Sequence, residues 1–441
     1  MSIIKLLSKK QNKILFTTPS HNQKSPFNKK YKAYYNDDFS EIDGFDNLSN
    51  PKGAILIAQG RASEILGTKY TYFITQGATT AIHCAMKAII EPNDKVLVAR
   101  NCHKSVFNGL ILTFAQIDWF LPENDEKWGI YTHIDVEKLE ATFKLNQYKA
   151  FIMTSPTYEG INSDIKKISD LCKKYNIYLI VDEAHGFLNN FCNLLPKSAI
   201  EQGADISINS LHKTGGALNQ TALLNINKHM QNVDFEIFQK TINLFHTTSP
   251  SYPLLANIEQ CISFLNSTHG RNKITNLLNE ISNFKDNLLQ YNVKFYENEN
   301  HDPTKILLQK EGINGFELSD VISEKFNIED EMCNNNSCLY LTGIGTTKHN
   351  LNKLKNALKK IKTNPSYKFE NQDFQPFPLV KIQPWQTFGR DYTYANKNDS
   401  ILKISNKMIL PYPPGIGLLY PGEAIQEWHL KYLGNDVEIM V

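Results

Sequence analysis

The chain has 441 residues, of which 41% are hydrophobic and 21% are charged, and its formal net charge is +2. This is ordinary globular composition in a chain long enough for at least two domains. The basic residues form no stripe and no apolar run is long enough to span a bilayer, so we expect neither a nucleic-acid partner nor a membrane segment. The seven cysteines are scattered without a C-x-x-C pair. This excludes zinc-finger spacing and favours the reducing cytoplasm.

Residues 1–50 are polar and rich in turn formers, and they predict an N-terminal arm of loops and short elements. From residue 51 onward, apolar runs alternate with amphipathic stretches. The runs predict strands at 70–75, 94–100, 115–121, 149–155, 177–183 and 204–210. The stretches predict helices at 55–68, 76–90, 163–176, 254–267 and 273–292. This alternation predicts an α/β fold, with a large domain at 51–285 whose mostly parallel central sheet is flanked by helices.

The pattern changes in the last third of the chain. Strands are predicted at 293–297, 304–309 and 338–344, and helices at 315–326 and 349–361, with a linker at 364–378. Residues 286–441 are therefore predicted to form a smaller α+β C-terminal domain.

Polar side chains gather where five of the predicted strands end, which is the edge at which open parallel sheets bind ligands. Helix 76–90 begins directly after strand 70–75, and its N-terminal N–H groups and two hydroxyls favour a phosphate. The other four strands bring titratable or hydroxyl groups to the same edge: His103; Ser155, Thr157 and Tyr158; Asp182, Glu183 and His185; and Ser210, His212 and Lys213.

Each of these features has an ordinary explanation when it is taken alone. Glycine turns before helices are common, Asp182 could cap the next helix, His103 could be a core histidine, and Lys213 could extend to solvent. A buried carboxylate, however, requires a cationic partner or several donors. A lysine held beside other cations loses its proton more readily, and a neutral amine forms imines with carbonyls.

Pyridoxal 5′-phosphate is one ligand that would use all five strand ends together. Its ring nitrogen requires a carboxylate (Asp182), its ring face a flat partner (His103) and its aldehyde a lysine (Lys213). Its phosphate suits the turn and helix start after strand 70–75 and a nearby hydroxyl, which are provided by Gly77, Ala78, Thr79, Thr80 and Ser210.

These residues resemble the bacterial ornithine/lysine/arginine decarboxylase family, which contains pyridoxal-phosphate enzymes of the aspartate-aminotransferase fold (fold type I). The resemblance covers nearly the whole chain and looks like the short form of the family, without an N-terminal wing domain. The matching segments are "RNCHKSVFNGLIL" (100–112), "TSPTYEG" (154–160), "VDEAHG" (181–186), "SLHKT" (210–214), "HTTSPSYPLLA" (246–256) and "PYPPGIGLLYPGE" (411–423).

The resemblance implies a role for each matching residue. Lys213 would bind the cofactor aldehyde, Asp182 would bind the pyridine nitrogen, and His103 would stack on the ring. His185 would lie near the ring substituents and the substrate carboxylate. The residues implied at the phosphate are Thr79, Ser210 and His212.

The resemblance also implies a homodimer, because in this family the active site forms at the subunit interface. Thr248 and Ser249 would then reach the phosphate of the neighbouring subunit. The sequence departs from the family at Ser20 and Asn22 in the N-terminal arm and at Gln76-Gly77-Ala78 in the phosphate loop.

The implied activity is decarboxylation of lysine, ornithine or arginine to a polyamine-type amine and CO2. Lys407 stands where the family commonly has an acid or amide that helps to recognise a basic substrate. This departure leaves open a same-fold enzyme that acts on another amino acid, or that catalyses transamination or another lyase reaction. A catalytically silent paralogue that binds an active homologue is the remaining alternative.

Overall fold

The computed structural model of the protein describes residues 2–10, 32–42, 44–230, 236–371, 374, 379–410 and 416–441. The departures at Ser20 and Asn22 and the "PYPPG" part of the C-terminal motif lie outside these ranges. Within them, no helix is both long enough and apolar enough to cross a membrane.

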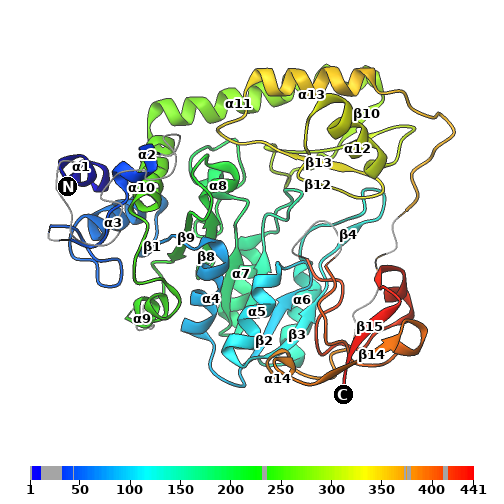
Figure 1. Ribbon diagram of the computed structural model, residues 1–441, viewed down its shortest axis with the longest axis horizontal. Coiled ribbons are helices and arrows are strands. Elements are labelled where there is room, and N and C mark those ends of the chain that lie inside the picture. The colour runs from blue at the N-terminus through cyan, green and yellow to red at the C-terminus, as the bar shows by residue number, and fades with distance from the viewer. Residues whose placement is uncertain are drawn as a thin grey trace.

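A seven-stranded sheet forms the centre of the large domain (Figure 1), in the order β1-β9-β8-β7-β6-β2-β3. The pairs β2–β3, β2–β6, β6–β7 and β7–β8 are parallel, whereas β9 is antiparallel to both of its neighbours. The predicted mostly parallel sheet is thus confirmed. The strands are β1 (Tyr70–Ile74), β2 (Lys95–Ala99), β3 (Gln116–Phe120), β6 (Ala150–Thr154), β7 (Tyr178–Asp182), β8 (Ile206–Ser210) and β9 (Ala222–Ile226).

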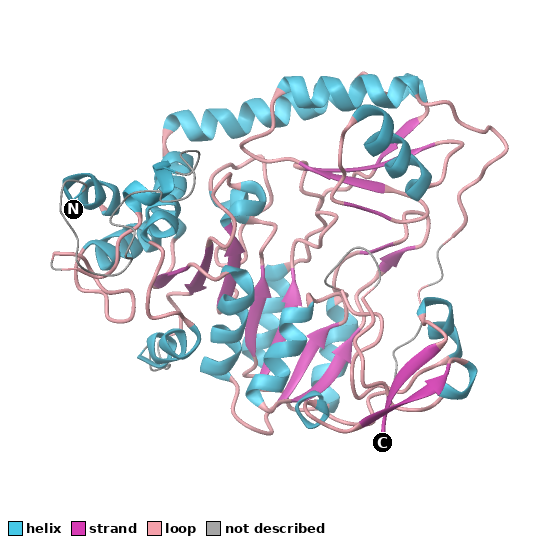
Figure 2. Cartoon of the chain, viewed as in Figure 1, coloured by secondary structure: helices cyan, strands magenta, loops and turns pink. Residues whose placement is uncertain are grey.

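Helices cover both faces of this sheet, as Figure 2 shows. One face packs against α4, α5 and α9 through a core that includes Ile82, Phe107 and Phe238. The other face packs in part against α6 and α7, through Leu139 and Ile168. The large-domain helices are α3 (Ala54–Leu66), α4 (Gly77–Ile89), α5 (Lys104–Thr113), α6 (Val136–Leu145), α7 (Ile165–Lys174), α9 (Glu236–Phe245) and α10 (Tyr252–Asn266).

A second sheet, which we call the small-domain sheet, has four antiparallel strands in the order β10-β11-β13-β12 and a core of its own. Its strands are β10 (Val293–Phe295), β11 (Lys305–Lys310), β12 (Met332–Cys333) and β13 (Cys338–Leu341). The helices packed with it are α11 (Thr268–Asp286), α12 (Gly315–Phe326) and α13 (Lys348–Lys360).

Residues 379–410 and 416–441, which we call the C-terminal unit, pack around another separate core. This unit contains α14 (Pro384–Thr387) and a two-stranded ribbon of β14 (Tyr392–Asn396) and β15 (Asp436–Met440). It contacts the large domain near α5, where the rings of Phe114 and Trp385 lie 5.7 Å apart. The residues after 285 therefore form two packed units. The predicted boundaries after residues 50 and 285 stay predictions.

Short elements complete the chain. Helix α1 (Ile3–Lys10) lies against α10, where the backbone N–H of Ile3 donates to Glu259 Oε2 over 2.8 Å. Further short elements include α2 (Lys32–Asp37), the hairpin of β4 (Asn124–Asp125) and β5 (Ile130–Tyr131), and α8 (Leu211–Thr214).

Candidate active site

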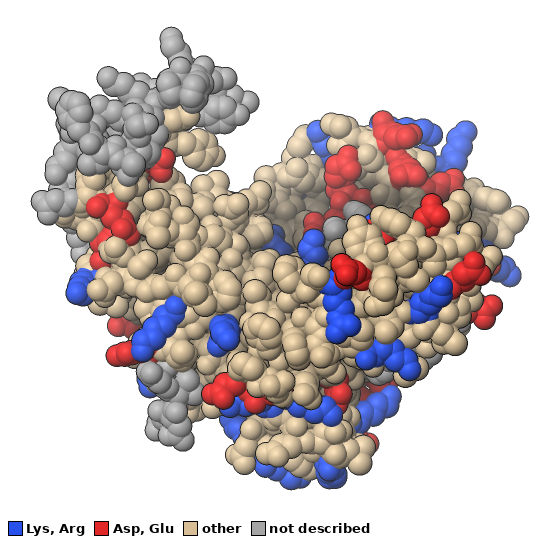
Figure 3. Space-filling view, turned by 60° about the horizontal axis from the view of Figure 1, so that its bottom comes forward, with Lys and Arg blue, Asp and Glu red and all other residues tan. Residues whose placement is uncertain are grey.

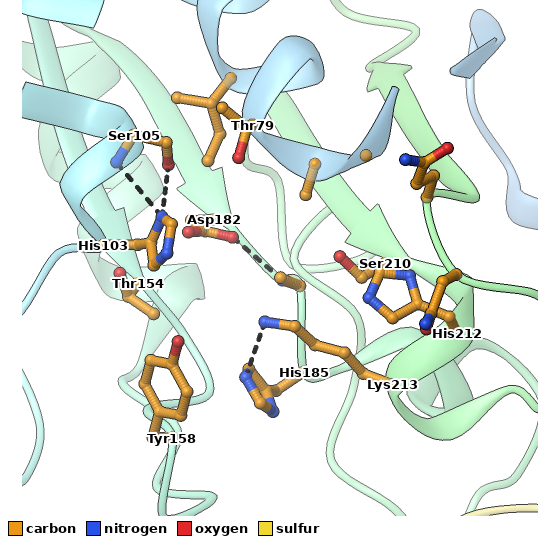
Figure 4. Close-up of a pocket in the computed structure, with 16 residues that line it drawn as sticks. Thr79, His103, Ser105, Thr154, Tyr158, Asp182, His185, Ser210, His212 and Lys213 are labelled. Carbon is orange, nitrogen blue, oxygen red and sulfur yellow. Dashed lines mark hydrogen bonds between the residues drawn. The ribbon is translucent and has the colours of Figure 1, made fainter. Parts of the chain in front are cut away.

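A cavity of about 470 Å³ lies at the carboxyl ends of β6, β7 and β8 and at the start of α4. Its size is typical of a pocket for a cofactor with a small substrate. Figure 4 shows the labelled side chains converging on it from separate elements. Its lining includes most of the predicted site residues, namely Gly77, Ala78, Thr79, His103, Asp182, His185, Ser210, His212 and Lys213.

Lys213 reaches the cavity because β8 ends at Ser210 and the chain then turns into the four-residue helix α8. Its Nζ lies 2.8 Å from His185 Nε2, within hydrogen-bonding distance. Burial lowers the pKa of Lys213, while the negative charge of Asp182 acts in the opposite direction. Burial also lowers the pKa of His185 well below its usual value, and the charge of Lys213 adds to that effect. This pair therefore favours a neutral amine that can act as a nucleophile.

Asp182 is the last residue of β7 and is only 5% exposed. Burial raises the pKa of its carboxyl group, and the charge of Lys213 only partly opposes this rise. One carboxylate oxygen accepts a hydrogen bond from the N–H of Ala184 over 3.1 Å. Because a buried carboxylate is costly without a cationic partner, the cavity favours a ligand with positive charge beside Asp182.

His103 is the N-cap residue of helix α5. Its Nδ1 accepts from the N–H of Ser105 over 3.2 Å and lies 2.8 Å from the Ser105 hydroxyl. Burial, together with nearby cations, lowers the pKa of His103 to about 4. The ring is consequently neutral near pH 7, which suits stacking on a flat ligand.

The start of α4 provides a cradle for an anion. Gln76 at its N-cap supplies no side-chain hydrogen bond to the helix, so the first-turn N–H groups are not capped by that residue. Gly77 has φ +80°, and a Cβ atom placed there would meet no heavy atom within 4 Å. Glycine is therefore required by the backbone conformation, which only glycine adopts at little cost.

Two buried polar atoms of the lining have no hydrogen-bond partner among the described residues: His185 Nδ1 and Thr154 Oγ1. Buried polar atoms of folded proteins are nearly always paired. These two atoms therefore mark places on the cavity wall where atoms of a ligand can bind.

Several residues singled out in the sequence are absent from this lining: Ser155, Thr157 and Glu183, and also Thr80, Thr248, Ser249 and Lys407. The hydroxyl of Thr80 donates to the carbonyl of Gln76 over 3.3 Å. Thr248 and Ser249 are exposed in the loop between α9 and α10, and their predicted reach into a neighbouring subunit stays a prediction. Lys407 lies in the C-terminal unit, where its Nζ is 3.5 Å from Glu438 Oε1 and its side chain is 62% exposed.

The lining also contains residues to which the sequence assigned no role. Tyr158 lies over the Lys213–His185 pair, with its ring 4.6 Å from that of His185 and 5.3 Å from Lys213 Nζ. Asn219 and Gln220 line the cavity from the loop between α8 and β9. No periodic pattern identifies residues of such a loop.

Comparisons with known proteins agree with this geometry. The Orn/Lys/Arg decarboxylase major-domain profile matches residues 4–302, and the C-terminal-domain profile of the same family matches residues 381–438. An arginine decarboxylase of Bacillus anthracis is 30% identical over 459 aligned residues, which cover 97% of this chain and 91% of that protein.

Solved structures share the fold. The lysine decarboxylase LdcF of Francisella novicida superposes with a TM-score of 0.84 at 20% identity, covering 96% of this chain and 75% of that one. The constitutive lysine decarboxylase of E. coli gives a TM-score of 0.81 at 20% identity, covering 98% and 77%. With the family profiles spanning most of its length, this chain belongs to the Orn/Lys/Arg decarboxylase family and is an amino-acid decarboxylase.

Proposed function

We propose that this protein uses pyridoxal 5′-phosphate to decarboxylate a basic amino acid (arginine, lysine or ornithine) to the corresponding amine and CO2. The observation that carries the proposal is the placement of Lys213, hydrogen-bonded to His185, in the same cavity as the buried Asp182. The relatives named above, which are arginine and lysine decarboxylases, support the substrate class.

The residues of the cavity fit this cofactor. Lys213 would bind its aldehyde, Asp182 would pair with its ring nitrogen, and His103 would lie against the ring. The phosphate would be held at the start of α4, by groups drawn from Gly77, Ala78, Thr79, Ser210 and His212. When it is bound, pyridoxal phosphate supplies a protonated ring that accepts the electron pair of the broken bond between Cα and the carboxylate.

The chain itself contributes buried polar groups and a means of moving protons. Asp182, His185 and Ser210 are each at most 5% exposed, whereas Lys213 is half-buried. Lys213 Nζ and His185 Nε2 share a hydrogen bond, along which a proton can pass between the two groups. These two groups would return a proton to the Cα atom of the product.

The basic side of the substrate would be recognised by Glu331, which lies just before β12. The charges of Glu331 and Lys213 affect each other's pKa values, which supports this role although Glu331 is not part of the cavity lining. Lys407, the residue that cast doubt on a basic substrate, is instead paired with Glu438 at the surface. Figure 3 shows a hollow in the surface with acidic side chains grouped along one side and basic side chains also beside it.

The complete site would be that of a homodimer. Thr248 and Ser249 are exposed and lie outside the cavity of their own chain, so they are free to approach a second subunit. Their hydroxyls would bind the phosphate of the cofactor in the partner subunit.

The proposal is tested by incubating the purified chain and pyridoxal phosphate with carboxyl-labelled arginine, lysine and ornithine. We expect labelled CO2 and one corresponding amine, identified by mass spectrometry. Lys213→Ala should abolish CO2 release, because it removes the amine that binds the aldehyde. Lys166→Ala, which removes an exposed lysine paired with Asp170, should leave it unchanged. Retained turnover in Lys213→Ala, or no CO2 from any basic amino acid while the cofactor is bound, would refute the proposal.

A further inference from the structure

A buried lysine of the small-domain sheet lies directly behind the candidate active site. Lys305 is the first residue of β11, and its side chain is 0% exposed. Its ammonium group donates to the backbone carbonyl of His185 over 2.7 Å, to Asp302 Oδ2 over 2.6 Å and to Thr304 Oγ1 over 3.1 Å. All three N–H bonds of the ammonium group therefore have an acceptor. One of those acceptors is the main chain of a cavity residue.

The ion-pair partner of Lys305, Asp302, is also held by several hydrogen bonds. Asp302 is 2% exposed, and its Oδ1 accepts from the N–H of Thr304 over 2.8 Å and from its hydroxyl over 2.7 Å. The N–H of Asp302 donates to the carbonyl of Gly160 over 2.7 Å. The ion pair thus connects the small-domain sheet to two loops of the cavity, the one after β6 and the one after β7.

The charge of Lys305 also acts on the reacting groups. Burial is the main reason that the pKa values of Lys213 and His185 are lowered, and the positive charge of Lys305 lowers both further. The groups that act on this pair come from several elements. The cationic or titratable bases are Lys305, His103 and His212, and the acids are Asp182 and Glu331. Tyr158 adds the face of its ring.

Lys305 is the buried cation of this set with no proposed contact to substrate or cofactor. Burying an ion pair costs free energy, and a pair of apolar side chains of similar volume joins two domains at least as well. Unlike an apolar side chain, the charge of Lys305 acts on both Lys213 and His185.

We propose that Lys305 is a positioning residue of the active site, which fixes the main chain at His185 and places a buried positive charge behind the Lys213–His185 pair. This inference rests on the proposed function, in which the neutral amine of Lys213 is the reacting group. It makes the small-domain sheet part of the machinery that sets the protonation state of the cavity.

The test measures Lys213 directly, without cofactor or substrate. The full-length chain is labelled with trace acetic anhydride across a pH series, and acetylation at Lys213 is quantified by peptide mass spectrometry. In Lys305→Met the pH midpoint of Lys213 labelling should rise by about one unit, because a nearby like charge has been removed. Below the midpoint this corresponds to roughly tenfold slower labelling at a given pH.

Three further variants separate this role from a purely structural one. Lys310→Met removes another buried lysine of β11, whose Nζ donates to the carbonyl of Tyr291 over 3.1 Å, and it should leave the Lys213 midpoint unchanged. Lys305→Arg keeps the charge and should restore the midpoint. Asp302→Asn combined with Lys305→Met leaves no unpaired buried carboxylate, so it provides a folded protein if Lys305→Met alone does not fold. It should show a smaller upward shift than Lys305→Met, because the negative charge of Asp302 is removed together with the positive one.

An unchanged Lys213 midpoint in both Lys305→Met and the double variant would overturn the inference. So would an equal shift in Lys310→Met, because that result would show a general loosening of the sheet. These outcomes are separable from failure of the proposed function, because labelling requires no decarboxylation. A chain that releases CO2 but shows no shift refutes only the role of Lys305.

Discussion

Three lysines of this chain carry the same functional group and differ only in their surroundings. Lys213 lies in the cavity and its pKa is lowered by burial. Lys305 is fully buried and ion-paired with Asp302. Lys407 is 62% exposed beside Glu438. Burial of a lysine without a fixed acidic partner favours its neutral, reactive amine. A fixed carboxylate partner instead favours the charged ammonium form. Local environment, and not residue type, assigns the three roles.

At the same scale, Glu331→Gln tests the basic end of the substrate. A hydrogen bond to a charged group contributes about 1.5–3 kcal/mol, so its loss should raise the KM for the preferred basic amino acid by about tenfold or more. We expect a much smaller change in kcat, because Glu331 would act on the distal group and not on the bond that breaks. Initial-rate kinetics on the cofactor-loaded enzyme measure both constants.

The control for this prediction is Glu329→Gln, two residues earlier, whose carboxylate accepts from the Ser323 hydroxyl at the surface. Its KM should stay close to that of the unmodified protein. A loss of kcat at constant KM in Glu331→Gln would contradict a role in substrate recognition.

At the scale of elements, the site exists because strands that run in the same direction end at the same edge. Asp182 ends β7, Lys213 follows β8, and His103 follows β2 after a short turn. Segments far apart in the chain meet here because parallel pairing aligns their carboxyl ends. The positions of these side chains also depend on loops of the small-domain sheet that pack against the site.

One of these loops gives a prediction about packing. After β13, Gly343 approaches α8 so closely that a Cβ atom would lie 2.5 Å from the Thr214 carbonyl oxygen, and the N–H of Ile344 donates to that oxygen over 3.0 Å. Gly343→Ala should cost about 1–3 kcal/mol of stability, because the obstructing atom belongs to the main chain. It should also lower activity by shifting the helix that carries Lys213.

Thermal unfolding and initial rates measure these two effects. Gly345→Ala is the matched control in the same loop, since a Cβ atom there would meet nothing within 4 Å. Equal behaviour of the two variants would show that the loop adapts and that its contact with α8 is not close enough to matter.

At the scale of the whole molecule, the C-terminal unit is attached behind His103 by a buried ion pair. Arg100 Nη2 donates to Glu423 Oε2 and to the carbonyl of Leu418, both over 3.0 Å, and its guanidinium lies 4.5 Å from the rings of Trp119 and Tyr420. An antiparallel bridge also joins the backbone of His103 to residue 416. The unit therefore supports the segment that carries His103.

Glu423→Gln should accordingly destabilise the protein by about 3–5 kcal/mol, because it leaves the Arg100 charge buried without a counter-charge. Urea unfolding of the full-length chain measures the change. Glu438→Gln, which removes the partner of the exposed Lys407, should cost about 1 kcal/mol or less. If the two variants were equally stable, the Arg100–Glu423 pair would not be what holds the unit in place.

The sequence predicted the strands and site residues that follow from local patterns of polar and apolar residues. Apolar runs marked six strands of the central sheet, and the polar residues at their ends marked Lys213, Asp182 and His103. It did not mark α5, whose first turn lies within the His103 motif, or β9, whose antiparallel direction no local pattern reveals. Asn219, Gln220 and Glu331 were also missed, because residues of irregular loops carry no periodicity.

The sequence by itself determined the fold class, the family and the principal cavity residues, since these depend on the order of polar and apolar residues along the chain. Only the tertiary structure decided what surrounds them. It paired Lys213 with His185, left Lys407 at the surface beside Glu438, and brought Lys305 of a separate sheet into contact with the main chain of His185. The protonation of Lys213 and His185 depends on burial and on the charges of residues distant in the sequence. Both arise only when the chain has folded.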